Sequence, residues 1–172
     1  MPRSTPTRRV VEFVDTSILL EILGVPGKTQ RQEEVLAELR DREDRRQDLI
    51  LPTAAVIETG NHIHHLPDGT ARRSCAQAFS TVLELSARGE APWVLHDATW
   101  DGHILDRIRS GCSTGADLVE HATRGRSGLG TGDLSVLAER DLYREKRVDP
   151  RYVEVCVWCS DQLLSNYATA SP

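Results

Sequence analysis

Aromatic residues and long apolar runs are both scarce in this chain of 172 residues. Only 5% of the residues are aromatic, and no apolar stretch approaches the ~18 residues that suggest a membrane-spanning helix. The N-terminal segment lacks an uninterrupted apolar core and a small-residue cleavage site, which argues against a signal peptide. We therefore predict a protein without a membrane partner.

The chain also has few cysteines and no net positive charge. The four cysteines are scattered, so they form no disulfide framework, and the composition favours a reducing, cytoplasmic location. The 26 acidic residues outnumber the 21 basic ones and give a net charge of −5. This balance argues against a protein that holds nucleic acid through bulk positive charge. It is compatible with an enzyme whose acidic site holds cations while local arginines meet phosphates.

Strand and helix patterns alternate along the chain, which has the size of one domain spanning residues 1–172. Short apolar runs predict strands at Val10–Val14, Leu49–Leu51, Trp93–Leu95 and Val153–Trp158. Helical periodicity covers Gln30–Asp44, Ala54–His65, Ala71–Arg88, Trp100–Arg109 and Leu134–Lys146. This alternation predicts an α/β fold, a three-layer α/β/α sandwich with a mainly parallel central sheet.

Three further segments carry local predictions. The pairs Glu38/Arg42 and Asp41/Arg45, spaced i,i+4, are expected on the solvated side of the first long helix. Residues 111–130 contain five glycines and are expected to form a long surface loop with a short helix at Ala116–Ala122. Residues 1–8 form a basic N-terminal arm.

Three acids, Asp15, Asp133 and Asp161, stand at element ends that face the same edge of such a sheet, and Glu58 lies on a helix that can lean over that edge. In open parallel sheets, ligands bind beyond the carboxyl ends of the strands. Each aspartate also has an ordinary interpretation, since Asp, Thr or Ser at positions 15–17 suits a helix cap and an acid suits a helix N-terminus. Glu58 is harder to explain, because it interrupts an apolar segment.

The combination predicts a metal centre. Two like charges ~5 Å apart repel by about 3 kcal/mol at an effective dielectric constant of ~20, so clustered carboxylates must protonate or bind a cation. Oxygen-only ligands suit one or two Mg²⁺ or Mn²⁺ ions. The chemistry that follows is metal-assisted phosphodiester hydrolysis.

The order of motifs resembles the PIN-domain nucleases, with VapC-type toxins as the most familiar members. It runs Val-Asp-Thr-Ser, Pro-x-x-x-x-x-Glu, Gly-x-Gly-Asp-x-x-x-Leu and a strand ending in Ser-Asp-x-x-Leu, and spans residues 10–167. The resemblance implies a Mg²⁺- or Mn²⁺-dependent endoribonuclease whose acids are Asp15, Glu58, Asp133 and Asp161. Thr16 and Ser17 match the polar pair after the first acid. RNA is the implied substrate, and an antitoxin and a second copy of the chain are the implied partners.

The sequence departs from the family pattern at several points. Cys159 stands where members often carry Thr, the stretch 111–130 is long, and the basic arm is additional. Asp117 is a rival for the third acid, but we prefer Asp133 because a long periodic helix and then the last strand follow it.

Other constellations are weaker. Cys156 and Cys159 have metal-site spacing, but residues three apart on a strand point to opposite faces, so we expect core cysteines. His62 and His65 share a helix face with Glu58, which leaves an imidazole ligand as a minor alternative to surface histidines, His64 among them. For substrate contact, Arg124 and Arg126 are the candidates, and Arg8 and Arg9 are weaker ones.

Two rival functions stay open. The same sandwich could serve as a non-catalytic module that binds RNA or a protein partner. A doubly wound nucleotide-binding domain is disfavoured, because no glycine fingerprint follows the first strand.

Overall fold

The computed structural model describes residues 8–169, without the side chain of Arg147. Its sheet has three parallel strands in the order β2-β1-β3: β1 (Arg9–Val14), β2 (Asp48–Ile50) and β3 (Val153–Trp158). The α/β class and the parallel sheet predicted from the sequence are confirmed. Of the basic arm, only Arg8 lies within the described residues.

The expected strand at Trp93–Leu95 is wrong. Trp93 forms only an isolated parallel bridge with Leu49, held by hydrogen bonds from the Leu49 amide to the Pro92 carbonyl and from the Val94 amide to the Leu49 carbonyl. Pro92 has no N–H to extend a ladder, and β2 is only three residues long. The segment therefore adds a short edge contact and no fourth strand.

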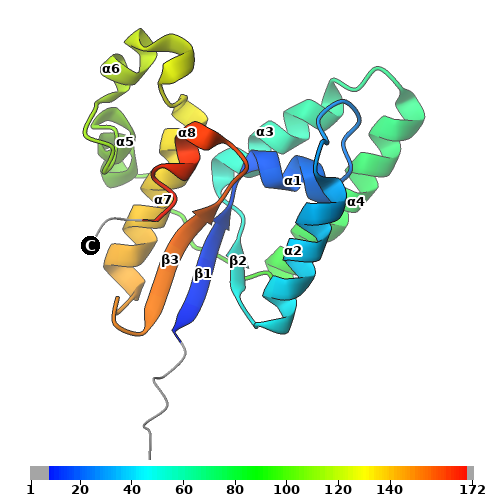
Figure 1. The fold of residues 1–172 in the computed structure, drawn as a ribbon, viewed down its shortest axis with the longest axis horizontal. Helices are drawn as coiled ribbons and strands as arrows, with labels where there is room; N and C mark the ends of the chain where they lie inside the picture. Colours follow the sequence, from blue (N-terminus) through cyan, green and yellow to red (C-terminus); the bar gives the residue numbers. More distant parts are fainter. Residues whose placement is uncertain (1–7, 170–172) are drawn as a thin grey trace, which may run out of the picture.

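Helices cover both faces of the sheet, as a three-layer sandwich requires (Figure 1). The helices are α1 (Thr16–Ile22), α2 (Gln32–Asp44), α3 (Thr53–His64), α4 (Gly69–Arg88), α5 (Gly102–Arg109), α6 (Leu118–Thr123), α7 (Thr131–Arg147) and α8 (Gln162–Ser165), with a 3₁₀ turn η1 (Gly125–Ser127). The sequence patterns located all of them except α1 and α8, which are short, and the turn η1. No helix among residues 8–169 is long and apolar enough to cross a membrane.

Alternating side chains of the strands supply the two halves of the core. On one face, Val11 and Phe13 of β1 pack in a cluster with residues of α5 and α7. On the other face, Val14 packs with residues of α1 and α2. A third apolar cluster joins the end of α1 to α3 and α4. The layers thus hold the carboxyl ends of the strands against the N-terminal ends of α1 and α3.

The glycine-rich stretch 111–130 is more ordered than a surface loop. It contains α6 and η1, and the expected short helix is confirmed with its start shifted to Leu118. His121, only 2% exposed, anchors the stretch, because its ring nitrogens contact the Leu129 amide (3.1 Å) and the Thr114 hydroxyl (2.8 Å). Gly128 permits this packing, since a Cβ there would lie 2.0 Å from the His121 carbonyl oxygen.

Candidate active site

Two of the four acids follow adjacent strands. Asp15 comes directly after β1 and caps α1, and Asp161 comes three residues after β3 and caps α8. The last residues of the two strands, Val14 and Trp158, are partners in the sheet register. Their parallel pairing therefore delivers both carboxylates to one edge of the sheet.

Ser17 links the two strand ends. Its hydroxyl donates to Asp15 Oδ2 (2.6 Å) and accepts a hydrogen bond from the Ser160 amide (3.0 Å), next to Asp161. The Ser17 amide also donates to Asp15 Oδ2 (3.0 Å). The polar residue after the first acid thus fixes the Asp15 carboxylate and holds the loop that carries Asp161.

Glu58 on α3 joins the same edge through Thr16. The Thr16 hydroxyl, almost fully buried, donates to Glu58 Oε2 at 2.8 Å. The other Glu58 oxygen lies against Gly132, where a Cβ would stand 2.0 Å from Oε1. A glycine is thus needed there for Glu58 to hold this position.

Asp133 follows Gly132 in the first turn of α7, and its Oδ2 accepts the Gly130 amide at 2.8 Å. A continuous chain of contacts or bonded neighbours therefore connects all four acids through Ser160, Ser17, Thr16 and Gly132. Asp117, the rival third acid, instead caps α6 in a capping box with Glu120.

The acids raise one another's proton affinity. Burial raises the pKa of Asp133 to about 6, and the charges of Asp15, Asp161 and Glu58 add to the increase against the hydrogen bond from Gly130. Burial also raises the pKa of Asp15, with a smaller contribution from the charge of Glu58. Among the described residues, none of the four acids forms an ion pair with Arg or Lys. The edge is thus a site of uncompensated negative charge.

Cys159 borders this site. Burial raises the pKa of its thiol to about 12, and the nearby charges of Asp15, Asp161 and Asp133 act in the same direction. Without a bound metal ion, the thiol therefore stays protonated. Cys156 points to the opposite face, where its sulfur contacts Glu12. The two thiols thus lie on different faces, and both are part-buried rather than the fully buried core cysteines that were expected.

The donor set fits a hard divalent cation in its chemistry, because every candidate ligand atom is a carboxylate oxygen. Asp15, Asp133 and Asp161 each use a single oxygen for the hydrogen bonds within residues 8–169. In their present positions, however, no group of three or more His, Cys, Asp or Glu among those residues could hold a metal ion. A site with three or more protein ligands would require some of these side chains to move.

The remaining candidates lie outside this edge. Arg124 caps the C-terminus of α6, Arg126 lies within η1, and both are exposed a few residues before Asp133. Arg9 forms an ion pair with Asp48 at the opposite end of β1, and Arg8 donates to the Pro150 carbonyl there. Both arginines therefore lie at the end of β1 opposite the acidic edge.

The three histidines take part in local contacts. His65 Nδ1 lies 2.7 Å from the carbonyl oxygen of Asn61 in its own helix, and the ring packs edge-on against His64. His62 is half-buried on the same helix.

Sequence reasoning missed the part played by Gly132. The signal was present in the Gly-x-Gly-Asp motif, but only the packing against Glu58 gives the glycine a reason. Comparison with protein-family models, with curated proteins and with solved structures gave no match to this chain. The assignment of a function therefore depends on the residues and their geometry.

Proposed function

We propose that this protein is a metal-dependent endoribonuclease of the PIN type, with Asp15, Glu58, Asp133 and Asp161 as its active-site acids. The observation that carries the proposal is the chain of contacts from Asp161 to Asp133, which brings acids from four separate parts of the sequence to one edge of a parallel sheet. Such an edge is where ligands of open α/β sheets bind.

The four carboxylates would hold Mg²⁺ or Mn²⁺, and the bound ion would supply a water of lowered pKa and stabilise charge on the scissile phosphate. The protein's own groups prepare the site. Ser17 orients Asp15, Thr16 orients Glu58, and the Gly130 amide orients Asp133. Arg124 and Arg126 are suited to hold the flanking phosphates of RNA, because a guanidinium matches phosphate geometry.

A substitution at Asp15 tests this proposal. Asp15→Asn keeps a side-chain acceptor for the Ser17 amide but removes a charge from the site, and we expect the rate of RNA cleavage in Mn²⁺ to fall at least about 100-fold. Asp106→Asn is the matched control, because Asp106 is an exposed acid on α5 whose one ion pair within residues 8–169 is with Arg109. If purified Asp15→Asn cleaved RNA as fast as the parent chain, the proposal would be wrong.

The second candidate function is a non-catalytic module that binds RNA or a protein partner. One observation favours it, namely that within residues 8–169 no three potential ligands are placed to hold a metal. Isothermal titration with Mn²⁺ separates the two candidates. A nuclease gives a saturable heat that Asp15→Asn weakens, whereas the module gives none. An antitoxin and a second copy of the chain remain proposals that follow from the same resemblance.

A further inference from the structure

A pocket of about 460 Å³ lies away from the acidic edge. Its walls come from α5, the second half of α7 and the segment after α8, which meet on one flank of the sheet (Figure 1). The polar side chains that line it include Arg107, Ser113, Asp141, Arg144, Glu145 and Asn166. Its volume falls within the range of about 300–1,000 Å³ that small-molecule sites occupy.

Asp141 gives this pocket an unsatisfied acceptor. The residue is 7% exposed, and its Oδ1 accepts two hydrogen bonds from the guanidinium of Arg140, at 2.9 and 2.7 Å. Its Oδ2 is buried and has no hydrogen-bond partner within residues 8–169. Leaving a buried acceptor unpaired is unfavourable. Because this oxygen is closed to solvent, the Asp141 carboxylate would have to rotate towards the pocket to accept a hydrogen bond from an amino or hydroxyl donor of a ligand.

Two guanidinium groups supply the opposite charge. Arg144 lines the pocket and forms no ion pair with any other described residue, whereas Arg107 of α5 pairs with Glu145 of α7. Paired arginines match the geometry and charge of a phosphate group. Val148, Pro150 and Tyr167 add an apolar and aromatic surface beside them. The pocket thus presents cations, an apolar wall and a buried acceptor together.

We infer that this pocket binds a nucleoside monophosphate. Arg107 and Arg144 would hold the phosphate, and Tyr167 and its apolar neighbours would contact the base or sugar. After rotation of its carboxylate, Asp141 would accept a hydrogen bond from an amino or hydroxyl group. The site is distinct from the acidic edge. Arg144 is eleven residues after Asp133 on α7, which corresponds to about 16 Å along the helix axis.

Isothermal titration of the full chain with AMP tests the inference, and GMP, CMP, UMP, ribose 5-phosphate and inorganic phosphate serve as comparison ligands. EDTA in the buffer excludes metal-mediated binding at the acidic edge. We expect saturable binding of AMP that Arg144→Gln weakens at least about tenfold. Arg73→Gln is the matched control, because Arg73 is exposed on α4, and we expect AMP affinity within about twofold of the parent.

Glu145→Gln gives a test of opposite sign. It removes the ion-pair partner of Arg107 and a negative charge from the pocket wall, so AMP should bind more tightly, by about two- to fivefold. If Arg144→Gln failed to fold, the AMP affinity of Glu145→Gln alone would test the inference. Asp15→Asn should bind AMP as the parent does, which keeps this result independent of the proposed nuclease.

Three outcomes would overturn the inference. They are the absence of saturable heat with every monophosphate at millimolar concentration, parental affinity in a folded Arg144→Gln variant, and inorganic phosphate binding as tightly as AMP. The last result would mean that the arginines hold a simple anion and that Asp141 and the apolar wall contribute nothing.

Discussion

Two buried carboxylates, one within β1 and one just beyond its end, lie in opposite electrostatic environments. Glu12 lies within β1 and is 7% exposed, and Asp15 lies just beyond its end and is 6% exposed. Glu12 forms an ion pair with Arg42, whose Nε and Nη2 donate to its two carboxylate oxygens at 2.5 and 3.2 Å. Among the described residues, Asp15 has no cationic partner and shares its surroundings with three other acids.

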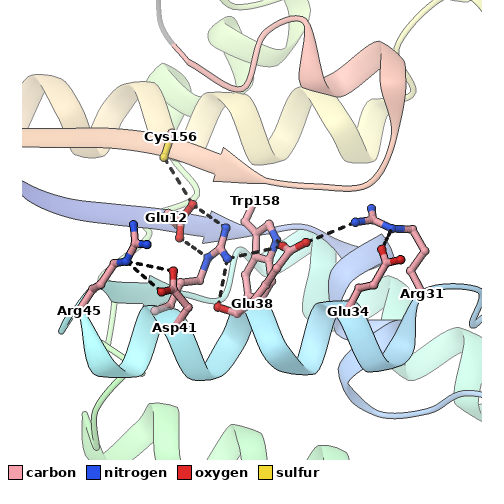
Figure 2. Close-up of polar contacts among 9 residues, drawn as sticks. Glu12, Arg31, Glu34, Glu38, Asp41, Arg45, Cys156 and Trp158 are labelled. Atoms are coloured by element: carbon pink, nitrogen blue, oxygen red, sulfur yellow. Dashed lines mark hydrogen bonds and ion pairs between the residues drawn. The ribbon is translucent and has the colours of Figure 1, made fainter.

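The environment of Glu12 is built to neutralise a buried charge. Figure 2 shows Glu12, Glu38 and Trp158 gathered between β1, β3 and α2. The guanidinium carbon of Arg42 lies 3.7 Å from the centre of a Trp158 ring, whose indole N–H donates to Glu38 at 3.0 Å. A buried charge with a complete set of partners serves the fold. A buried charge without them, at the edge where strands end, is the better functional candidate.

The largest effect is expected from removing the cation of the Glu12 cluster. Arg42→Ala leaves Glu12 buried without its ion-pair partner, so the free energy of unfolding should fall by about 3 kcal/mol. Urea denaturation monitored by tryptophan fluorescence measures this loss. Arg45→Ala, on the same helix, removes only the exposed pair with Asp41 and should change stability by less than about 0.5 kcal/mol.

A double variant sharpens the interpretation. Glu12→Gln combined with Arg42→Met removes both charges and should recover most of the lost stability, because no unpaired buried charge remains. Equal losses in Arg42→Ala and Arg45→Ala would show that the two ion pairs are equivalent and that burial at Glu12 has no special cost.

The next effect concerns the contact between Glu58 and Gly132. Gly132→Ala places a methyl group 2.0 Å from the present position of Glu58 Oε1, so the exposed glutamate must move away. We expect RNA cleavage to fall about tenfold while unfolding free energy changes by no more than about 1 kcal/mol, because alanine favours the helix. Gly102→Ala, at the start of α5, has open space around its Cβ and controls for the added methyl group. A Gly132→Ala variant with parental activity would exclude Glu58 from the reaction.

The sequence patterns located the three strands of the sheet and the long helices, but they also predicted a strand at Trp93–Leu95 that does not form, and they did not reveal the roles of individual polar groups. The continuous apolar runs located β1 and β3 because buried parallel strands must be apolar on both faces. Arg42, expected on the solvated side of α2, instead points to the sheet, where it pairs with Glu12 as well as with Glu38 at 3.5 Å. Helical spacing indicates which residues share a face, but which acid a long arginine reaches depends on the tertiary packing.

The same limit applies to the acidic edge. The positions of Asp15 and Asp161 follow from the ends of two recognisable strands, and parallel pairing places them together. The link through Ser17 to Ser160 depends on a turn whose geometry no periodicity encodes. The short helices α1 and α8 were missed because four to seven residues are too few for a 3.6-residue period to emerge.

A pH-dependent prediction follows for Asp133. Because its folded-state pKa is raised from 3.8 to about 6, the folded chain binds more protons than the unfolded chain between these values, and stability falls as the pH rises through this window. Asp133→Asn should therefore stabilise the protein at pH 8, by about 1 kcal/mol after allowance for partial exposure. The gain should vanish near pH 4, where the aspartate is protonated in the folded state. Thermal melting across this pH range measures both limits.

Asp149 provides a control of opposite sign. Its hydrogen bonds with Arg151 lower its pKa from 3.8 to about 2, so its contribution to stability is present above pH 4 and is lost as the pH falls through the lowered value. Asp149→Asn should thus weaken the protein slightly at pH 8. If both variants shifted the melting temperature in the same direction, the electrostatic contrast between the two acids would be wrong.

The smallest effect is expected at the two arginines that precede Asp133 in the sequence. Arg124 and Arg126 are exposed and make no ion pairs within the described residues, whereas Arg9 is paired with Asp48 at the far end of β1. Replacing either Arg124 or Arg126 with Gln should raise the KM for RNA by about two- to fivefold, leave kcat unchanged, and reduce the salt dependence of binding by about one counterion. Arg9→Gln should alter neither KM nor kcat, because the Arg9 guanidinium pairs with Asp48 and lies away from the four acids. If Arg9→Gln instead raised KM as much as the other two variants, RNA would bind along the opposite end of the sheet, and the acidic edge would lose its connection to the substrate.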